Sequence, residues 1–149
     1  MNRVEFGRIG LVVVLLAGCV ANIGCNSGSS ASSQARRQQT SRLRLVVGMF
    51  VSAQRTLGHP PRDEAEFKQY INQNGSRVLE HAGVSSADEL LVSERDGKPL
   101  VVLYQPTPQQ KATGVIAYEA EGVDGRRDVG FQLGNIQSMT DAEFAELGL

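Results

Sequence analysis

The chain has 149 residues, of which 41% are hydrophobic and 21% charged, and its formal net charge is −1. This length allows one domain with a modest core once a leader is set aside. The two cysteines are too few for a disulfide framework, and neither has the spacing to a histidine that a metal site requires.

Charge is distributed unevenly along the chain. Residues 20–62 contain six arginines and no acid, whereas residues 63–149 contain seven basic and fifteen acidic residues. The basic segment has no aromatic residue before Phe50, so we expect no nucleic-acid partner. Two interpretations of Arg36 and Arg37 stay open: attraction to anionic lipid, and a solvated tether.

The beginning of the chain has the form of an export leader. Arg3 and Arg8 precede an apolar run of secretory-signal length. The run closes in Leu16-Ala17-Gly18-Cys19, which resembles the lipobox of bacterial lipoproteins. An uncleaved anchor and an ordinary cleaved signal are the alternatives, but a spanning helix needs about 20 apolar residues and Asn22 comes too early for that.

The lipobox resemblance implies how the protein is processed and where it is located. Residues 1–18 would be a signal peptide, and Cys19 would carry the lipid, including palmitate, as the first residue of the mature chain. The protein would then be anchored to a membrane of the cell envelope, facing the periplasm or the exterior. Val20 after the cysteine favours the outer membrane. Cys25 is then an unpaired thiol without an assigned role.

A tether and a helix follow the lipobox. Residues 19–40 are rich in small and polar residues without apolar periodicity, which predicts a flexible tether before a single domain at residues 41–149. Residues 41–57 carry apolar side chains at helical spacing. Gly58 offers a left-handed end, and the next two prolines prevent continuation. Arg42 and Arg44 oppose the helix dipole, so packing against a sheet must hold this helix.

A short second helix is expected after Asp63, which is placed to cap it, with Glu66 reaching back. Its buried stripe would be Phe67, Tyr70 and Ile71, and Gly75 would end it. Residues 76–86 are ambiguous between a helical turn and a loop.

The remainder of the chain has the pattern of strands. Residues 90–92 and 100–104 flank Asp96-Gly97, a strong hairpin signal. Residues 115–118 form the next strand, reached through a loop that contains Pro106 and Pro108. Residues 129–133 and 136–139 flank a two-residue turn at Gly134-Asn135. A capping box at residues 140–143 opens a final helix whose Phe144 and Leu147 face inward. We therefore predict an α+β fold: an N-terminal helix packed on a small antiparallel sheet, with a short second helix and a C-terminal helix.

These segments resemble small bacterial prepilin-like proteins related to the pseudopilins of type II secretion. The resemblance rests on the leading apolar helix, the Gly58-His59-Pro60-Pro61 step, the turn at residues 93–97 and the order of the final strands and helix. It covers residues 41–149 and implies a pseudopilin-like head. In the family a turn of Asp, Gly and His precedes the final strand, where this chain has Leu133-Gly134-Asn135. The lipobox stands where the filament helix would be, which argues against filament assembly.

No catalytic constellation stands out, and the protein is expected to be no enzyme and to need no cofactor. His59 lies between a helix end and two prolines, and His81 has only a sequence neighbour as a candidate partner. Oxygen ligands for a hard cation such as calcium are offered by an expected exposed loop, residues 121–128, and the strand before it. The candidate ligands are Glu119, Glu121, Asp124 and Asp128.

Two hypotheses follow from the sequence. The first is a non-enzymatic, lipid-anchored envelope protein that acts through contacts with an envelope protein of unknown identity, linked to a secretion or pilus-like system. The alternative is a periplasmic module that binds a cation or a small ligand.

Overall fold

The computed structural model describes residues 41–149. The signal peptide, the lipidated Cys19 and the tether predicted for residues 1–40 lie outside the described residues. The elements are α2 (Arg42–Leu57), α3 (Glu64–Asn74), α4 (Ser76–Ala82), α5 (Ala87–Leu90), β1 (Leu100–Val102), α6 (Pro108–Thr113), β2 (Val115–Glu119), β3 (Arg126–Phe131), β4 (Ile136–Thr140) and α7 (Asp141–Glu146). The fold is α+β, as the sequence predicts. Between residues 41 and 149, no helix has the length and apolar character needed to cross a membrane.

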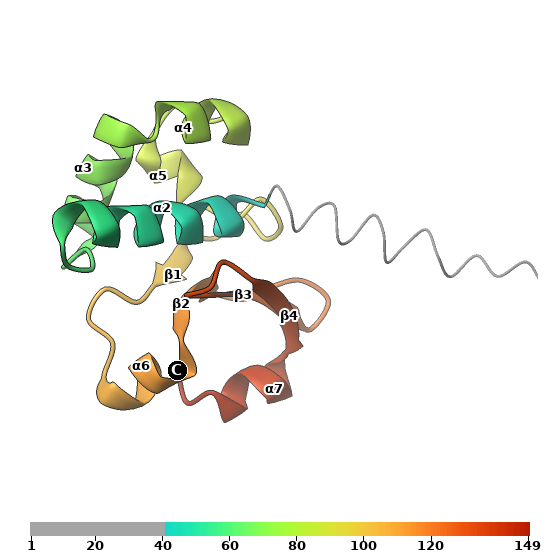
Figure 1. Cartoon of the computed structure of the whole chain (residues 1–149). Helices are drawn as coiled ribbons and strands as arrows, with labels where there is room; N and C mark the ends of the chain where they lie inside the picture. The colour runs from blue at the N-terminus through green and yellow to red at the C-terminus, as the bar shows by residue number, and fades with distance from the viewer. Residues whose placement is uncertain (1–40) are drawn as a thin grey trace, which may run out of the picture.

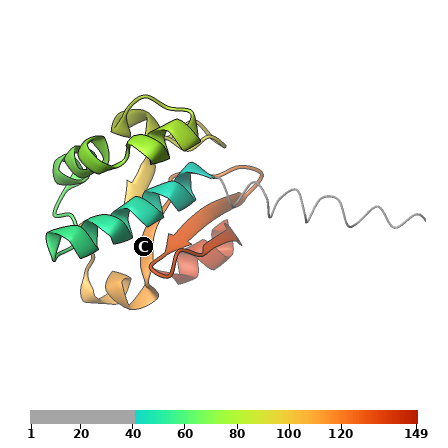
Figure 2. The same ribbon diagram turned by 45° about the horizontal axis from the view of Figure 1, so that its top comes forward.

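Helix α2 is the central element of the domain. It contacts β2 and β3 on one side and α3 and α4 on the other, so it lies between the sheet and the remaining N-terminal helices (Figures 1 and 2). Its buried side chains are Leu43, Val46, Val47, Met49, Phe50 and Ala53. Gly58 ends the helix at φ 77°, as expected. The prediction for residues 41–57 is confirmed, and so is packing against a sheet.

The N-terminus of α2 has an acidic partner that the sequence analysis did not identify. Ser41 caps the helix by accepting from the backbone amide of Arg44 at 3.3 Å. The carboxylate of Glu94 accepts from the amide of Arg42 at 3.1 Å, although 52 residues separate the two. A negative group at this end complements the helix dipole and offsets the unfavourable arginines.

Helix α3 follows the predicted pattern. Asp63 accepts from the amide of Glu66 at 2.8 Å, and the carboxylate of Glu66 reaches back to the amide of Arg62 at 2.7 Å. Phe67, Tyr70 and Ile71 are buried, and Gly75 is the C-cap.

The segment after α3 corrects one predicted strand. Residues 76–82 and 87–90 are helical, so Leu90, expected to begin a strand, ends α5. The reason is local, because Ser86 accepts from the amide of Glu89 at 3.3 Å and starts a helical turn. The hairpin around Asp96-Gly97 survives in reduced form, as the isolated bridge between Val92 and Pro99 and strand β1, which ends at Val102.

The sheet has four antiparallel strands in the order β1-β2-β3-β4. Strand β2 agrees with the prediction for residues 115–118, and β4 with that for residues 136–139. At the crossing with α2, Gly130 of β3 leaves room for the helix. A Cβ atom there would lie 2.5 Å from Cγ2 of Val47.

Three loop predictions are wrong. Strand β3 begins at Arg126, so the loop expected over residues 121–128 is shorter and its last residue, Asp128, is buried. The connection between β1 and β2, expected to be a loop containing Pro106 and Pro108, contains α6, because Thr107 and Gln110 form a capping box and Pro108 stands at the start of the helix. The β3–β4 turn is longer than two residues: Phe131 pairs with Asn135, and Gly134 adopts φ 81°, the pattern of a three-residue loop.

Helix α7 packs on β3 and β4. Its capping box is present, since Thr140 accepts from the amide of Glu143 and the Glu143 carboxylate accepts from that of Thr140. The ring of Phe144 lies 4.9 Å from that of Tyr118, and the Arg127 guanidinium lies 4.2 Å from the centre of the Phe144 ring. The predicted C-terminal helix is confirmed.

Candidate functional site

Two of the four carboxylates predicted as cation ligands meet inside the domain, around an arginine. Glu119 ends β2 and Asp128 lies in β3, and they are only 2% and 6% exposed. The guanidinium of Arg95 donates to Oε2 of Glu119 at 2.6 Å and contacts Oδ1 of Asp128 at 2.9 Å. A positive side chain therefore occupies the place where a cation was expected to lie between them.

Glu119 has further partners. The hydroxyl of Ser93 donates to its Oε1 at 3.0 Å, and the amide of Asp128 donates to its Oε2 at 2.7 Å. Burial raises the pKa of Glu119, and the Asp128 amide, Arg95 and Ser93 offset part of that rise. We call Ser93, Arg95, Glu119 and Asp128 the ionic cluster.

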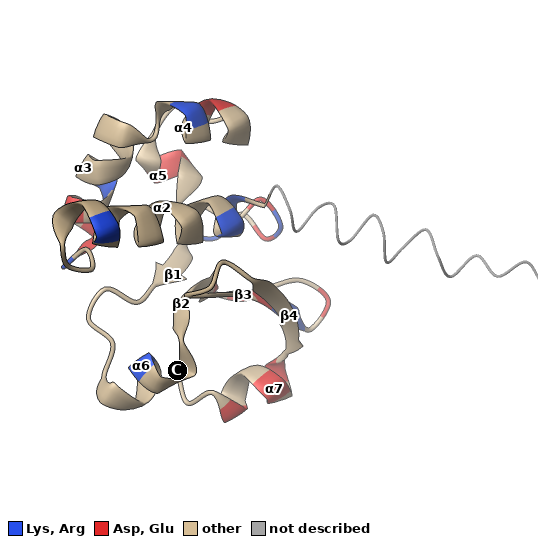
Figure 3. Ribbon diagram, viewed as in Figure 1, with Lys and Arg blue, Asp and Glu red and all other residues tan. Residues whose placement is uncertain are grey.

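The turn at residues 93–98 holds the ionic cluster in place. The Ser93 hydroxyl accepts from the amide of Arg95 at 3.1 Å, and Asp96 accepts from the amides of Lys98 at 2.9 Å and Gly122 at 3.0 Å. Burial by itself raises the pKa of Asp96, but these amides and the Ser93 hydroxyl together bring it below its ordinary value. Figure 3 shows this charged turn beside the basic N-terminal end of α2.

The other two predicted ligands lie apart from the ionic cluster. Glu121 is exposed and approaches the ammonium of Lys98 at 3.7 Å. Asp124 is exposed at φ 55°, in the turn closed by Val123 and Arg126. Within residues 41–149, no group of three or more His, Cys, Asp and Glu side chains is placed to hold a metal ion.

The two histidines do not lie with the ionic cluster. The Nδ1 of His59 donates to the carbonyl of Pro60 at 2.8 Å, and its Nε2 lies 3.3 Å from the Arg62 guanidinium. His81 is exposed on α4.

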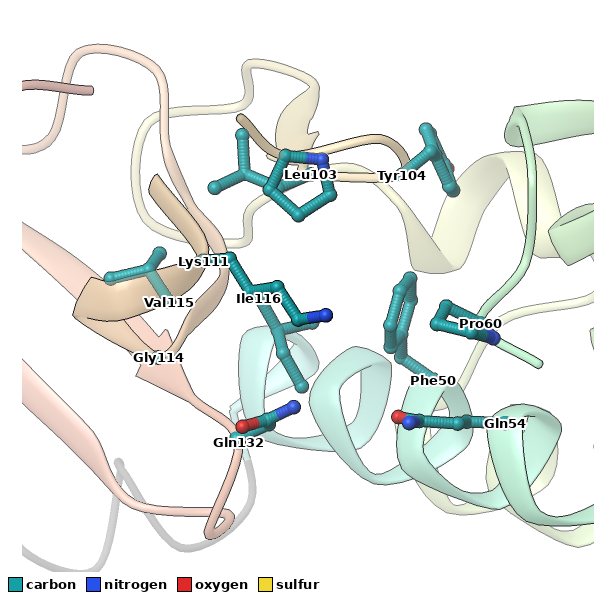
Figure 4. A pocket seen from close by; sticks show the side chains of 11 residues that line it. Phe50, Gln54, Pro60, Leu103, Tyr104, Lys111, Gly114, Val115, Ile116 and Gln132 are labelled. Atoms are coloured by element: carbon teal, nitrogen blue, oxygen red, sulfur yellow. The ribbon is translucent and has the colours of Figure 1, made fainter. Parts of the chain in front are cut away.

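A shallow cleft of about 190 Å³ opens beside the sheet, between α2, the β1–α6 connection, α6 and β2. Its floor consists of the buried side chains of Phe50, Val115 and Ile116. Figure 4 shows the lining, which is completed by Gln54, Pro60, Leu103, Tyr104, Pro106, Lys111, Gly114 and Gln132. We call this hollow the α2–α6 cleft.

Sequence reasoning missed both Arg95 and the cleft. A signal was present, because Glu119 and Asp128 directly adjoin the ends of apolar strand runs, but nothing local indicates which cation meets them. For the cleft, the available signal was Thr107-Pro108 with Gln110, which marks the start of α6.

No protein-family model, no curated protein and no solved structure matches the chain. The geometry of the described residues and the motif at Cys19 are therefore the ground on which a function is proposed.

Proposed function

We propose that the protein is a non-enzymatic, lipid-anchored protein of the cell envelope that acts through protein contacts, with a pseudopilin-like head linked to a secretion or pilus-like system. The observation that carries the proposal is the motif Leu16-Ala17-Gly18-Cys19 at the end of an apolar leader. A lipid on Cys19 would hold the domain at a membrane, at the distance allowed by residues 20–40.

The arrangement of the head agrees with this proposal. A long leading helix lies across an antiparallel sheet whose strands follow one another in chain order, and a short helix closes the domain. The leading helix and the closing helix are part of the order on which the resemblance to pseudopilin heads rests, and α4, α5 and α6 are additions to it.

The ionic cluster argues against the alternative of a cation-binding module. Arg95 already supplies a counter-charge between Glu119 and Asp128, and removing it would leave two buried carboxylates without one. Glu121 and Asp124 alone would offer a hard cation too few oxygen atoms, since calcium takes six to eight.

Lipidation tests the anchor directly. Cells that express the full chain are labelled with radioactive palmitate and fractionated. We expect label and membrane association in the wild type, their loss in Cys19→Ser, and no change in the matched control Cys25→Ser. Equal labelling of the wild type and Cys19→Ser would refute the anchor.

Cross-linking in intact cells tests the contact role. The full chain is captured from detergent-solubilised membranes after cross-linking, with Cys19→Ser as the control for membrane placement. Recovery of secretion-system components with the wild type is the expected result. Recovery of the protein alone, from membranes in which it is lipidated, would count against a contact function.

A further inference from the structure

Lys111 differs from the other lysines of the described chain. Lys68 pairs with Glu64 and Asp88, and Lys98 pairs with Glu121. Among residues 41–149, Lys111 alone of the three lysines has no acidic partner within ion-pair distance. It lies on α6 at the rim of the α2–α6 cleft.

Two carboxamides accompany this ammonium at the rim. Figure 4 shows the ends of Lys111, Gln54 and Gln132 turned toward the middle of the hollow, from α6, from α2 and from the β3–β4 turn. The three side chains therefore bring one full positive charge and two amide groups to one opening. Such a set suits a carboxylate, which accepts several hydrogen bonds and gains most from a charged donor.

The floor of the cleft suits an aliphatic group. Phe50, Val115 and Ile116 are at most 5% exposed and offer little surface themselves, but the half-buried Leu103, Tyr104 and Pro106 beside them leave apolar surface open beneath the polar rim. Covering such a surface with an aliphatic side chain is favourable, at about 25 cal/mol per Å² of apolar area removed from water. The ligand should therefore combine a carboxylate with a small aliphatic body.

The size and shape of the cleft favour the end of a chain. Its volume of about 190 Å³ is below the roughly 300 Å³ at which pockets for drug-sized ligands begin. It is also partly open to solvent, so the rest of a peptide has a way out.

The charges around the cleft orient the ligand. Asp63 and Glu64 act on the Tyr104 side, where burial first and these two acids next raise the pKa of the tyrosine. A carboxylate would be repelled from that side and drawn to the Lys111 and Gln132 side.

We infer that the α2–α6 cleft binds the carboxylate end of a partner polypeptide whose last residue is aliphatic, with the carboxylate on Lys111 and the side chain against the apolar lining of the cleft. This inference rests on the proposed role in protein contacts and identifies the chemistry of the contact.

The test is a titration of the ¹⁵N-labelled full chain in mild detergent with the peptide N-acetyl-Gly-Ala-Leu, followed by amide shifts of residues 103–116. The same peptide with a C-terminal carboxamide is the matched ligand. We expect saturable shifts with the acid, and binding of the carboxamide weaker by about tenfold or more, because one charge-assisted interaction is lost. Lys111→Met should weaken binding of the acid by a similar factor, and Lys98→Met, a lysine outside the cleft, should leave it unchanged.

Several results would overturn the inference. Equal binding of the acid and the carboxamide would show that the carboxylate is not recognised, and no saturable shift would show that the cleft is closed to chain ends. Tighter binding of free leucine than of the acetylated peptide would replace the chain end with a free amino acid. None of these results depends on lipidation or cross-linking. The peptide titration can therefore refute the binding of a chain end without refuting the lipid-anchored contact role, and the labelling and cross-linking experiments can refute that role without deciding the peptide result.

Discussion

Removing the carboxylate of Glu119 tests the role of the ionic cluster. Glu119→Ala leaves the Asp128 amide, which donated to it at 2.7 Å, without a partner in a buried place, at a cost of about 1–3 kcal/mol. It also removes the bonds from Ser93 and Arg95. The side chain of Arg95 is 30% exposed and keeps Asp128 at 2.9 Å, so its charge stays compensated. We therefore expect Glu119→Ala to lower the unfolding free energy by about 3 kcal/mol, near the lower end of the range for broken buried ion pairs.

The assay is urea unfolding of the full-length protein in mild detergent, followed by circular dichroism and extrapolated linearly to water. The matched control is Glu121→Ala, whose exposed contact with Lys98 at 3.7 Å should contribute less than about 1 kcal/mol. Glu119→Gln, which keeps the shape and one acceptor, should stay within about 1 kcal/mol of the wild type. A Glu119→Ala variant no less stable than Glu121→Ala would refute the reasoning.

The same carboxyl group predicts a pH dependence. Burial raises the pKa of Glu119 above its ordinary 4.5, so folding favours the protonated form. The stability contributed in this way is complete below about pH 4.5 and is lost as the pH rises through the raised pKa. As the pH rises through this interval, the wild type should therefore lose unfolding free energy relative to Glu119→Gln. A ¹³C titration of the carboxyl should give a pKa above 4.5. A carboxyl that titrates below 4.5 would contradict the burial argument.

Three further predictions concern the core, the sheet and the last helix. Phe67→Ala should lower the unfolding free energy by about 3–5 kcal/mol in the same assay, because the ring is fully buried, and a loss below about 1 kcal/mol would contradict its burial. Gly130→Ala should cost about 1–3 kcal/mol, since its Cβ would meet Val47 at 2.5 Å, and an unchanged urea midpoint would show that α2 does not lie this close to β3. Thr140→Ala should speed amide exchange in α7 at neutral pH, because it removes the side-chain cap of the helix. The wild-type helix should also loosen in acid, because Thr140 lowers the pKa of Glu143, and the stability from this carboxylate is complete above about pH 4.5 and is lost as the pH falls through the lowered pKa. If amide exchange is unaffected by both changes, the capping box is ruled out.

Local signals accounted for most of the helix and strand positions. The spacing of apolar residues located α2 and α3, and Gly58, Asp63 and Gly75 marked ends that the structure confirms. The helices that were missed also carry a local signal. Ser86 with Glu89 and Thr107 with Gln110 have the capping-box spacing, at the starts of α5 and α6. The apolar run at residues 90–92 favoured a strand, and Pro106 and Pro108 favoured a loop. A helix of four to six residues shows too little periodicity to outweigh such signals.

The candidate site was predictable only in part. Glu119 and Asp128 were identified from their residue type, and they do converge, but on Arg95 rather than on an open cation site. Their predicted partners Glu121 and Asp124 lie elsewhere, because β3 begins earlier than expected and draws Asp128 into the sheet.

By itself, the sequence determined the α+β class, the limits of the leading helix and the motif at Cys19, because each depends on residues a few positions apart. Only the tertiary structure decided what the charges do. Glu94 reaches the start of α2 across 52 residues, and Arg95 reaches Glu119 across 24. The α2–α6 cleft likewise needs three separate stretches of the chain to meet: residues 50–60, residues 103–116 and Gln132. Such contacts are fixed by how the apolar faces pack, and no short stretch of sequence contains that information.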